Sequence, residues 1–161
     1  MAEKKRRLGF LSAPSFPYRR KSLLSPAELE FYNVLKLAVG DRFLILLKVG
    51  LRDLCEITNR EVNQVAFDRL AAEQMDFVLC DQTTLAPVVA IELDDSTLYA
   101  RERAERDTFM KEFFRVIGVA LIHQRVQMGY DPAAIGRWID AAQPRPGGAA
   151  PQSPTPLRPA S

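Results

Sequence analysis

The apolar positions of the chain change period several times between residues 25 and 142, which predicts alternating helices and strands. The first helix begins at Ser25-Pro26-Ala27-Glu28, a capping box with Pro at the first helical position, and Gly40 ends it. The run 43–49 is almost wholly apolar, which is typical of a buried strand. The apolar stripe of the first helix, at the 3.6-residue period, consists of Phe31, Val34, Leu35 and Ala38.

A β-hairpin is expected in the middle of the chain. A helix is predicted over 60–71, and strands over 75–81 and 86–94 follow it. The short turn 82–84 separates the two strands, and so short a connection favours antiparallel pairing.

The last part of the domain predicts a helix, a strand and a helix. The helix over 100–117 has a charged first half and an apolar second half, and Gly118 ends it. A strand over 119–122 and a helix over 131–142 follow. Because a strand that returns after a long helix can lie parallel to its predecessor, the expected fold class is α/β, with a mixed β-sheet flanked by helices.

The composition is that of a globular protein with one core, since 47% of the 161 residues are apolar and 26% are charged. No apolar run approaches the ~20 residues of a membrane span, and the N-terminus lacks the apolar segment of a secretory signal. A cytoplasmic location without membrane contact is therefore expected. Cys55, in a predicted helix, and Cys80, in a predicted strand, lack CxxC spacing and are interpreted as buried reduced thiols.

Charge divides the chain into three parts. Residues 1–22 hold seven Lys/Arg and one acid without periodicity, which predicts a basic disordered arm. Residues 23–142, the predicted α/β domain, hold 13 Lys/Arg against 19 Asp/Glu. Residues 143–161 are rich in Pro, Gly, Ala and Ser, which predicts a disordered tail. The net charge of +2 therefore hides an acidic domain, which would repel phosphate backbones unless a cation or the basic arm intervenes.

Carboxylates interrupt both strands of the hairpin at positions where a core strand would be apolar. Glu92 and Asp94 are two residues apart and so share a face, and Asp76 on the partner strand can lie near them. Clustered carboxylates raise one another's pKa unless a cation is present, and such oxygen ligands suit Mg²⁺ or Mn²⁺. The three acids are a candidate metal site. The alternative is that they lie at strand ends, solvated or paired with arginines, and do no chemistry.

Five blocks occur in the order found in a known bacterial family. Together they resemble domain of unknown function 2726, which is similar to the very-short-patch-repair branch of the restriction-endonuclease-like superfamily with its PD-(D/E)xK signature. The resemblance covers about residues 22–142. The blocks are Leu23-Leu24-Ser25-Pro26-Ala27-Glu28, Asp76-Phe77-Val78-Leu79-Cys80-Asp81, Ile91-Glu92-Leu93-Asp94-Asp95-Ser96, Arg106-Asp107 and Tyr130-Asp131.

The resemblance implies a restriction-endonuclease-like core and a Mg²⁺-dependent endonuclease that acts on DNA. It implies Asp76 as the first acid, Glu92 as the acid of the ExK element and Glu28 as a further catalytic carboxylate on the first helix. Asp76, Glu92 and Asp94 would be the ligands of Mg²⁺ or Mn²⁺. DNA would be the partner, and the basic arm would assist in binding it.

Three positions depart from the family pattern. Asp94 stands where the superfamily has its lysine, Leu98 where the family usually has a His, and His123 where it usually has an Arg. An ammonium from elsewhere, on Lys48 or Lys111, would have to supply the missing charge. His123 is interpreted as a satisfied strand residue. These departures keep a second hypothesis open, a catalytically inactive nuclease-fold module that binds nucleic acid or protein.

The charged start of the long helix has two interpretations. Arg101, Arg103 and Arg106 would contact phosphates, or they would form i,i+4 pairs such as Glu102–Arg106 on a solvated face. The interleaved acids favour the i,i+4 pairs.

Overall fold

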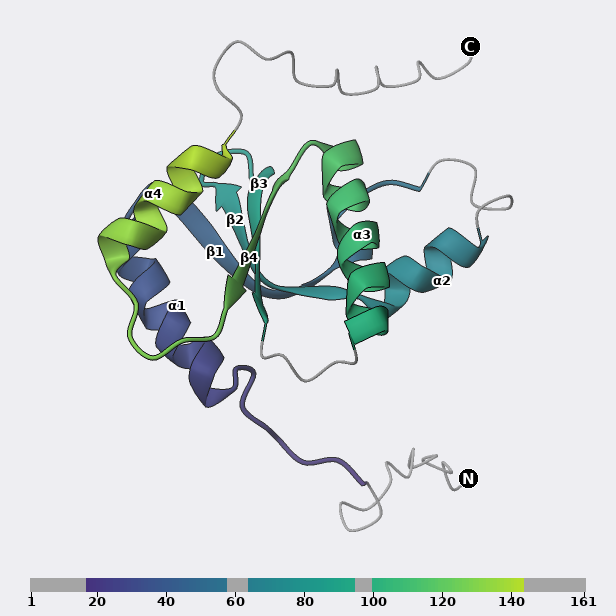
Figure 1. Ribbon diagram of the computed structural model, residues 1–161, viewed down its shortest axis with the longest axis horizontal. Coiled ribbons are helices and arrows are strands. Elements are labelled where there is room, and N and C mark those ends of the chain that lie inside the picture. Colours follow the sequence, from purple (N-terminus) through teal and green to yellow (C-terminus); the bar gives the residue numbers. More distant parts are fainter. Residues whose placement is uncertain (1–16, 58–63, 95–99, 144–161) are drawn as a thin grey trace, which may run out of the picture.

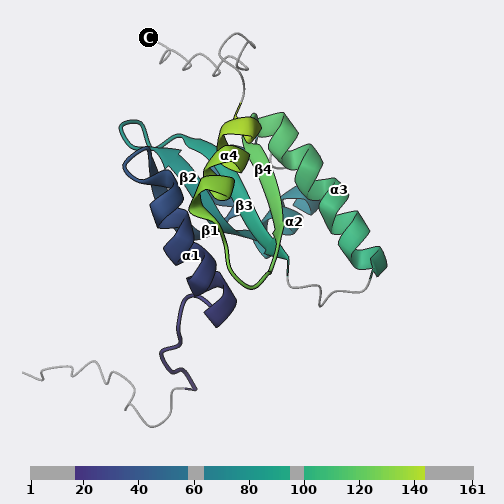
Figure 2. The ribbon, with the colours of Figure 1, turned by 60° about the vertical axis from the view of Figure 1, so that its left-hand side comes forward.

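The computed structural model describes residues 17–57, 64–94 and 100–143, and these form three layers (Figure 1). A four-stranded sheet carries α1 (Pro26–Val39) and α4 (Pro132–Ala142) on one face, and α2 (Gln64–Ala72) and α3 (Ala100–Ile117) on the other. In the turned view, α1 and α3 again stand on opposite sides of the strands (Figure 2). The predicted α/β architecture, a mixed sheet flanked by helices, is confirmed.

The strands follow the order β1-β2-β3-β4. β1 (Phe43–Gly50) and β2 (Gln74–Asp81) are antiparallel, β2 and β3 (Pro87–Asp94) are antiparallel, and β4 (Ala120–Arg125) is parallel to β3. The expected hairpin and the expected parallel return are both confirmed. These directions bring the C-terminal ends of β1, β3 and β4 to the same end of the sheet as the N-terminal end of β2.

Helix α1 begins and ends where the sequence predicts. Ser25 Oγ accepts the N–H of Glu28 at 3.3 Å, and Glu28 Oε2 accepts the N–H of Ser25 at 2.7 Å. Gly40 adopts φ +51° and donates its N–H to the carbonyl of Lys36, as helix-ending glycines do. The capping box therefore holds one oxygen of Glu28 at the start of the helix and leaves the other for a second contact.

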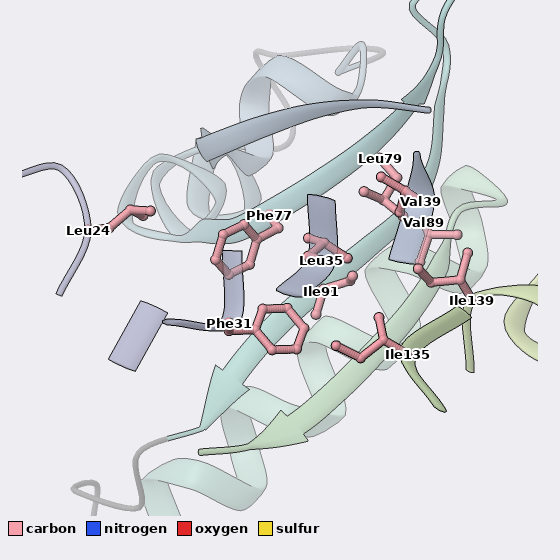
Figure 3. Close-up of a cluster of buried hydrophobic side chains, with 10 residues drawn as sticks. All are labelled: Leu24, Phe31, Leu35, Val39, Phe77, Leu79, Val89, Ile91, Ile135 and Ile139. Atoms are coloured by element: carbon pink, nitrogen blue, oxygen red, sulfur yellow. The ribbon is translucent and has the colours of Figure 1, made fainter. Parts of the chain in front are cut away.

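Apolar side chains form one core cluster on each face of the sheet. Residues of α1 and α4 pack on the first face, and Figure 3 shows their buried side chains converging on β2 and β3. Residues of α2, α3 and the segment before α2 pack on the second face. The first cluster consists of Leu24, Phe31, Leu35, Val39, Phe77, Leu79, Val89, Ile91, Ile135 and Ile139. The second consists of Leu51, Leu70, Met75, Val78, Cys80, Ala90, Met110, Phe114 and Val119.

Two local predictions need correction. Cys55, expected in a helix, instead follows the single 3₁₀ turn η2 (Leu51–Leu54) in an extended conformation. β4 continues to Arg125, because its parallel pairing with β3 extends as far as Asp94. Both thiols are free, and burial raises the pKa of each.

Several sequence predictions fall outside the described residues. These are the outer part of the basic arm (1–16), the start of the predicted second helix (60–63), Leu98 and the Pro-rich tail from 144 onward. Residues 17–22 are exposed and form neither helix nor strand. Within the described ranges, none of the helices has the length and apolar character needed to cross a bilayer.

Candidate functional site

The sequence-predicted acids come together at one end of the sheet. Glu28 lies in the first turn of α1, Asp76 near the start of β2, and Glu92 and Asp94 at the end of β3. The strand directions place all these positions at the same sheet end. Each acid contacts a cationic side chain there.

Lys48 of β1 joins two of these acids. Its Nζ lies 2.7 Å from Glu28 Oε1 and 2.6 Å from Asp76 Oδ1. The three side chains are only 16%, 20% and 14% exposed, respectively, so water screens these ion pairs less than it screens a surface pair. Of the two lysines considered from the sequence, Lys48 is the one that contacts these acids among the described residues.

The backbone at Lys48 is unusual for a strand. Lys48 has φ +53°, a left-handed conformation that costs a residue with a Cβ roughly 1–2 kcal/mol. Leu47 packs in the first core cluster, whereas Val49, two residues on, packs in the second. In a regular strand, both side chains would point to the same face, so the alternation reverses at Lys48.

The opposite strand reverses at the matching position. Phe77 belongs to the first cluster and Met75 to the second, and they pair with Leu47 and Val49 across the ladder. Asp76 therefore lies between them, opposite Lys48. Both strands change their buried face at the point where the ion pair forms.

Asp76 also connects β2 to β3. The described β2–β3 pairing reaches Phe77 and Ile91, and beyond it Asp76 Oδ2 accepts the N–H of Leu93 at 2.9 Å. A side chain thus takes the place of the next ladder hydrogen bond. The Asp76 carboxylate is thereby fixed beside the backbone that carries Glu92.

Glu92 is the buried acid of the site, with 8% of its surface exposed. Its Oε1 accepts a hydrogen bond from Arg106 of α3, which also binds Glu73 Oε2 at 2.8 Å. Its Oε2 is buried and has no hydrogen-bond partner among the described atoms, although His123 Nδ1 lies 3.5 Å away. Burying a carboxylate oxygen without a partner is costly, so this oxygen is suited to receive a cation or a proton donor.

Asp94 faces the same helix as Glu92, as the strand period predicts. Its Oδ1 lies 2.6 Å from Arg103 Nη2, one helical turn before Arg106 on α3. The expected i,i+4 pairing holds for Arg101 and Glu105, which are largely exposed. The side chain of Glu102, the expected partner of Arg106, lies outside the described ones. Packing of α3 on the sheet brings the guanidinium groups of Arg103 and Arg106 to the acids of β3.

The network changes the pKa of its members. Burial alone would raise the pKa of Glu28, but hydrogen bonds from Lys48 and Ser25 bring it below its ordinary value. Burial would lower the pKa of Lys48 and of Arg106, yet their carboxylate partners raise both. These three groups are therefore charged at neutral pH.

The acids outnumber the cations. Glu28, Glu73, Asp76, Glu92 and Asp94 are in contact with three cationic side chains, Lys48, Arg103 and Arg106. One buried oxygen of Glu92 has no hydrogen-bond partner among the described atoms and is suited to bind a cation. Among the described residues, no three His, Cys, Asp or Glu side chains form a ready-made metal cage. The carboxylate chemistry nevertheless fits Mg²⁺ or Mn²⁺ at Asp76 and Glu92.

The site is separate from a hollow of about 590 Å³ that residues of α2 and α3 line. That hollow is lined by Arg69, Ala104, Glu105, Thr108, Phe109 and Glu112. None of the five carboxylates lines it.

Fold and site together define a mixed α/β domain with a partly buried, acid-rich ion network at one end of its sheet. The chain belongs to the family described as protein of unknown function (DUF2726), whose model matches residues 20–142. No curated protein and no solved structure matched the chain.

Proposed function

We propose that this domain is a metal-dependent nuclease with a restriction-endonuclease-like core, which cleaves phosphodiester bonds of DNA. The observation that carries the proposal is the position of Asp76. Its carboxylate, on β2, is bonded to the backbone beside Glu92 and lies 2.6 Å from the ammonium of Lys48. Two acids and a lysine at one sheet end are the groups that metal-assisted phosphodiester hydrolysis needs.

Asp76 and Glu92 are the proposed metal ligands, and Asp94 is a further ligand or a group that orients water. A bound Mg²⁺ or Mn²⁺ would activate water and stabilise the charge that develops on the phosphate. The buried Oε2 of Glu92, which has no hydrogen-bond partner among the described atoms, supports a cation here. Arg103 and Arg106 orient Asp94 and Glu92 from α3.

Lys48 is proposed to supply the ammonium that an aspartate at position 94 cannot supply. Asp94 stands where the similar superfamily has a lysine, and the ammonium comes instead from β1. Glu28 also holds this ammonium, through its Oε1. An ammonium at this place would stabilise the negative charge of the reacting phosphate.

The proposed partner is DNA, and the basic arm is the proposed contact. Arg19, Arg20 and Lys21 are exposed and lie four to six residues before Ser25, the cap residue that contacts Glu28. They place positive charge next to a domain that is itself acidic. A phosphate backbone would therefore be drawn first to the arm.

The experiment is a cleavage assay on the full chain with supercoiled plasmid and single-stranded DNA, in Mg²⁺ and in Mn²⁺. Asp76→Asn and Glu92→Gln should each lower the cleavage rate at least about a hundredfold, because each removes a charged metal ligand. The matched control is Asp140→Asn, which removes an acid from the exposed Arg42–Asp140 pair and should leave the rate unchanged.

Two outcomes count against the proposal. Cleavage that survives in both site variants would come from a contaminating enzyme. Absence of cleavage by the unmodified chain with either metal would contradict nuclease activity on these substrates.

A catalytically inactive nuclease-fold module is the second candidate. Each of the five carboxylates already contacts a cationic side chain of the protein. Asp94, which stands where the similar superfamily has a lysine, is held by Arg103. Such a network also suits a domain that only binds nucleic acid or protein. If the protein binds labelled DNA but does not cleave it in either metal, this candidate is favoured.

A further inference from the structure

One ammonium links two carboxylates from different elements at this site. Lys48 Nζ lies 2.7 Å from Glu28 on α1 and 2.6 Å from Asp76 on β2, with all three side chains largely buried. A small cation shared by the two carboxylates would lie in the same place. Both distances are those of short, charge-assisted hydrogen bonds between an ammonium and a carboxylate.

The chain adopts an unfavourable backbone to put the ammonium there. Lys48 has φ +53°, and both β1 and β2 change their buried face at the Lys48–Asp76 position. Strained backbone of this kind persists where surrounding packing enforces it, and it is common at functional sites. The backbone position of Lys48 is therefore built into the fold.

We propose that Lys48 is an internal counter-cation that competes with the divalent metal for Asp76. This inference rests on the proposed metal-dependent function. A metal held by Asp76 would take the place of the ammonium at Oδ1, and Glu28 would keep the ammonium nearby. The ammonium thereby offsets part of the carboxylate charge in the absence of metal, and it weakens metal binding because two cations at one carboxylate repel each other.

The proposal makes an unusual prediction for Lys48→Met. Removal of a group that only supports the site should weaken metal binding or leave it unchanged. Removal of a competing cation should instead tighten it, by on the order of tenfold, since coupled charges in contact commonly interact with this strength. Lys48→Arg, which keeps the charge, should bind metal no more tightly than the unmodified chain.

The measurement is isothermal titration of the full chain with Mn²⁺ and with Mg²⁺, without DNA. Lys48→Gln accompanies Lys48→Met, since it is neutral but can still donate hydrogen bonds to both carboxylates, and it serves if the Met variant does not fold. Lys36→Met is the matched control, because Lys36 lies on α1 with its Nζ 4.7 Å from the ring centre of Tyr32, without a carboxylate contact in the described network. Circular dichroism verifies that each variant is folded.

The outcomes separate the two proposals. Tighter binding by the folded neutral Lys48 variants, with no change in Lys36→Met, supports competition. If the unmodified chain binds metal and the neutral variants bind it equally or more weakly, the competition is overturned but the metal site remains. Absence of binding by the unmodified chain and by the neutral variants removes the metal site itself, and with it the proposed function.

Discussion

At the residue scale, Arg106 binds two carboxylates that come from different parts of the chain. It binds Glu73, immediately before β2, and Glu92, near the end of β3. The Glu92 side chain is 11% exposed, so it depends on this guanidinium for compensation of its charge. A partly buried carboxylate that loses its cation retains the cost of desolvation without the attraction that offset it.

Arg106→Met should therefore lower the free energy of unfolding by about 2 kcal/mol, less than the loss expected for a fully buried pair. Urea unfolding at pH 7 measures this. The matched control is Arg101→Met on the same helix, where the Arg101–Glu105 pair is 91% and 66% exposed and the loss should stay below about 0.5 kcal/mol. Equal losses in both variants would contradict the special role of Arg106.

The acids of the site could be predicted from the sequence, whereas most of their partners could not. Asp76, Glu92 and Asp94 interrupt apolar strands, and that is a local signal. Their cations lie far away in sequence, since Lys48 is 28 residues from Asp76 and Arg106 is 14 residues from Glu92. The one available signal was the spacing of Arg103 and Arg106, one turn apart on a helix that follows the acidic strand.

At the element scale, the Glu28–Lys48–Asp76 contacts tie α1 to the first two strands. The pKa of Glu28 is below its ordinary 4.5, so its ionised form favours the folded state above about pH 4.5. The pKa of Lys48 is above its ordinary 10.5, so its charged form favours the folded state below about pH 10.5. The stabilisation from these contacts is full between these two pH values. It is lost as Glu28 takes up a proton in acid or as Lys48 loses one in base.

Glu28→Gln should accordingly cost stability in a pH-dependent way. At pH 7 the loss should be about 1 kcal/mol, since a charge-assisted hydrogen bond is replaced by a neutral one. The loss should shrink as pH falls below 4.5, because the Glu28 carboxyl is then becoming neutral as well. Urea unfolding at pH 7 and pH 3 measures the change, with Asp140→Asn as an exposed control. A loss of equal size at both pH values would show that the charge of Glu28 does not stabilise the fold.

Elements with local signals were predicted well. The capping box before α1, the short hairpin turn and the glycine after α3 each fix an element end through neighbouring residues. The face reversal at Lys48 and Asp76 has no such signal, because a lysine does not favour positive φ and only tertiary packing imposes it. The extension of β4 to Arg125 likewise depends on its parallel partner.

At the scale of the whole molecule, charge is segregated along the chain and in space. The basic residues before α1 stand against a domain in which acids outnumber bases by 19 to 13 over residues 23–142. Both views show the described part of the arm leaving α1 at the end of the molecule where α3 begins (Figures 1 and 2). The positive segment thus leads into the helix whose first turn carries Glu28 of the ion network.

The triple variant Arg19→Ala/Arg20→Ala/Lys21→Ala should weaken binding of duplex DNA and flatten its salt dependence. Each lost phosphate contact reduces the slope of log K against log salt by about 0.9, so three contacts give a change of up to about 2.7. Fluorescence anisotropy with a labelled duplex in EDTA, from 50 to 200 mM salt, measures the slope without cleavage.

The control for the arm is Lys36→Ala/Arg115→Ala/Arg137→Ala. It removes the same charge from exposed positions on α1, α3 and α4. An equal effect of both triple variants would assign the binding to net charge and not to the arm.

The hydrogen bond from the Leu93 N–H to Asp76 Oδ2 has a practical consequence. An amide proton that a side chain protects exchanges with solvent at a rate that depends on that side chain, whereas its ladder neighbours depend on the sheet. The Leu93 amide is thus an intrinsic spectroscopic reporter of the Asp76 carboxylate. Its exchange rate and chemical shift register the arrival of a metal or a proton at Asp76 without any label or substrate.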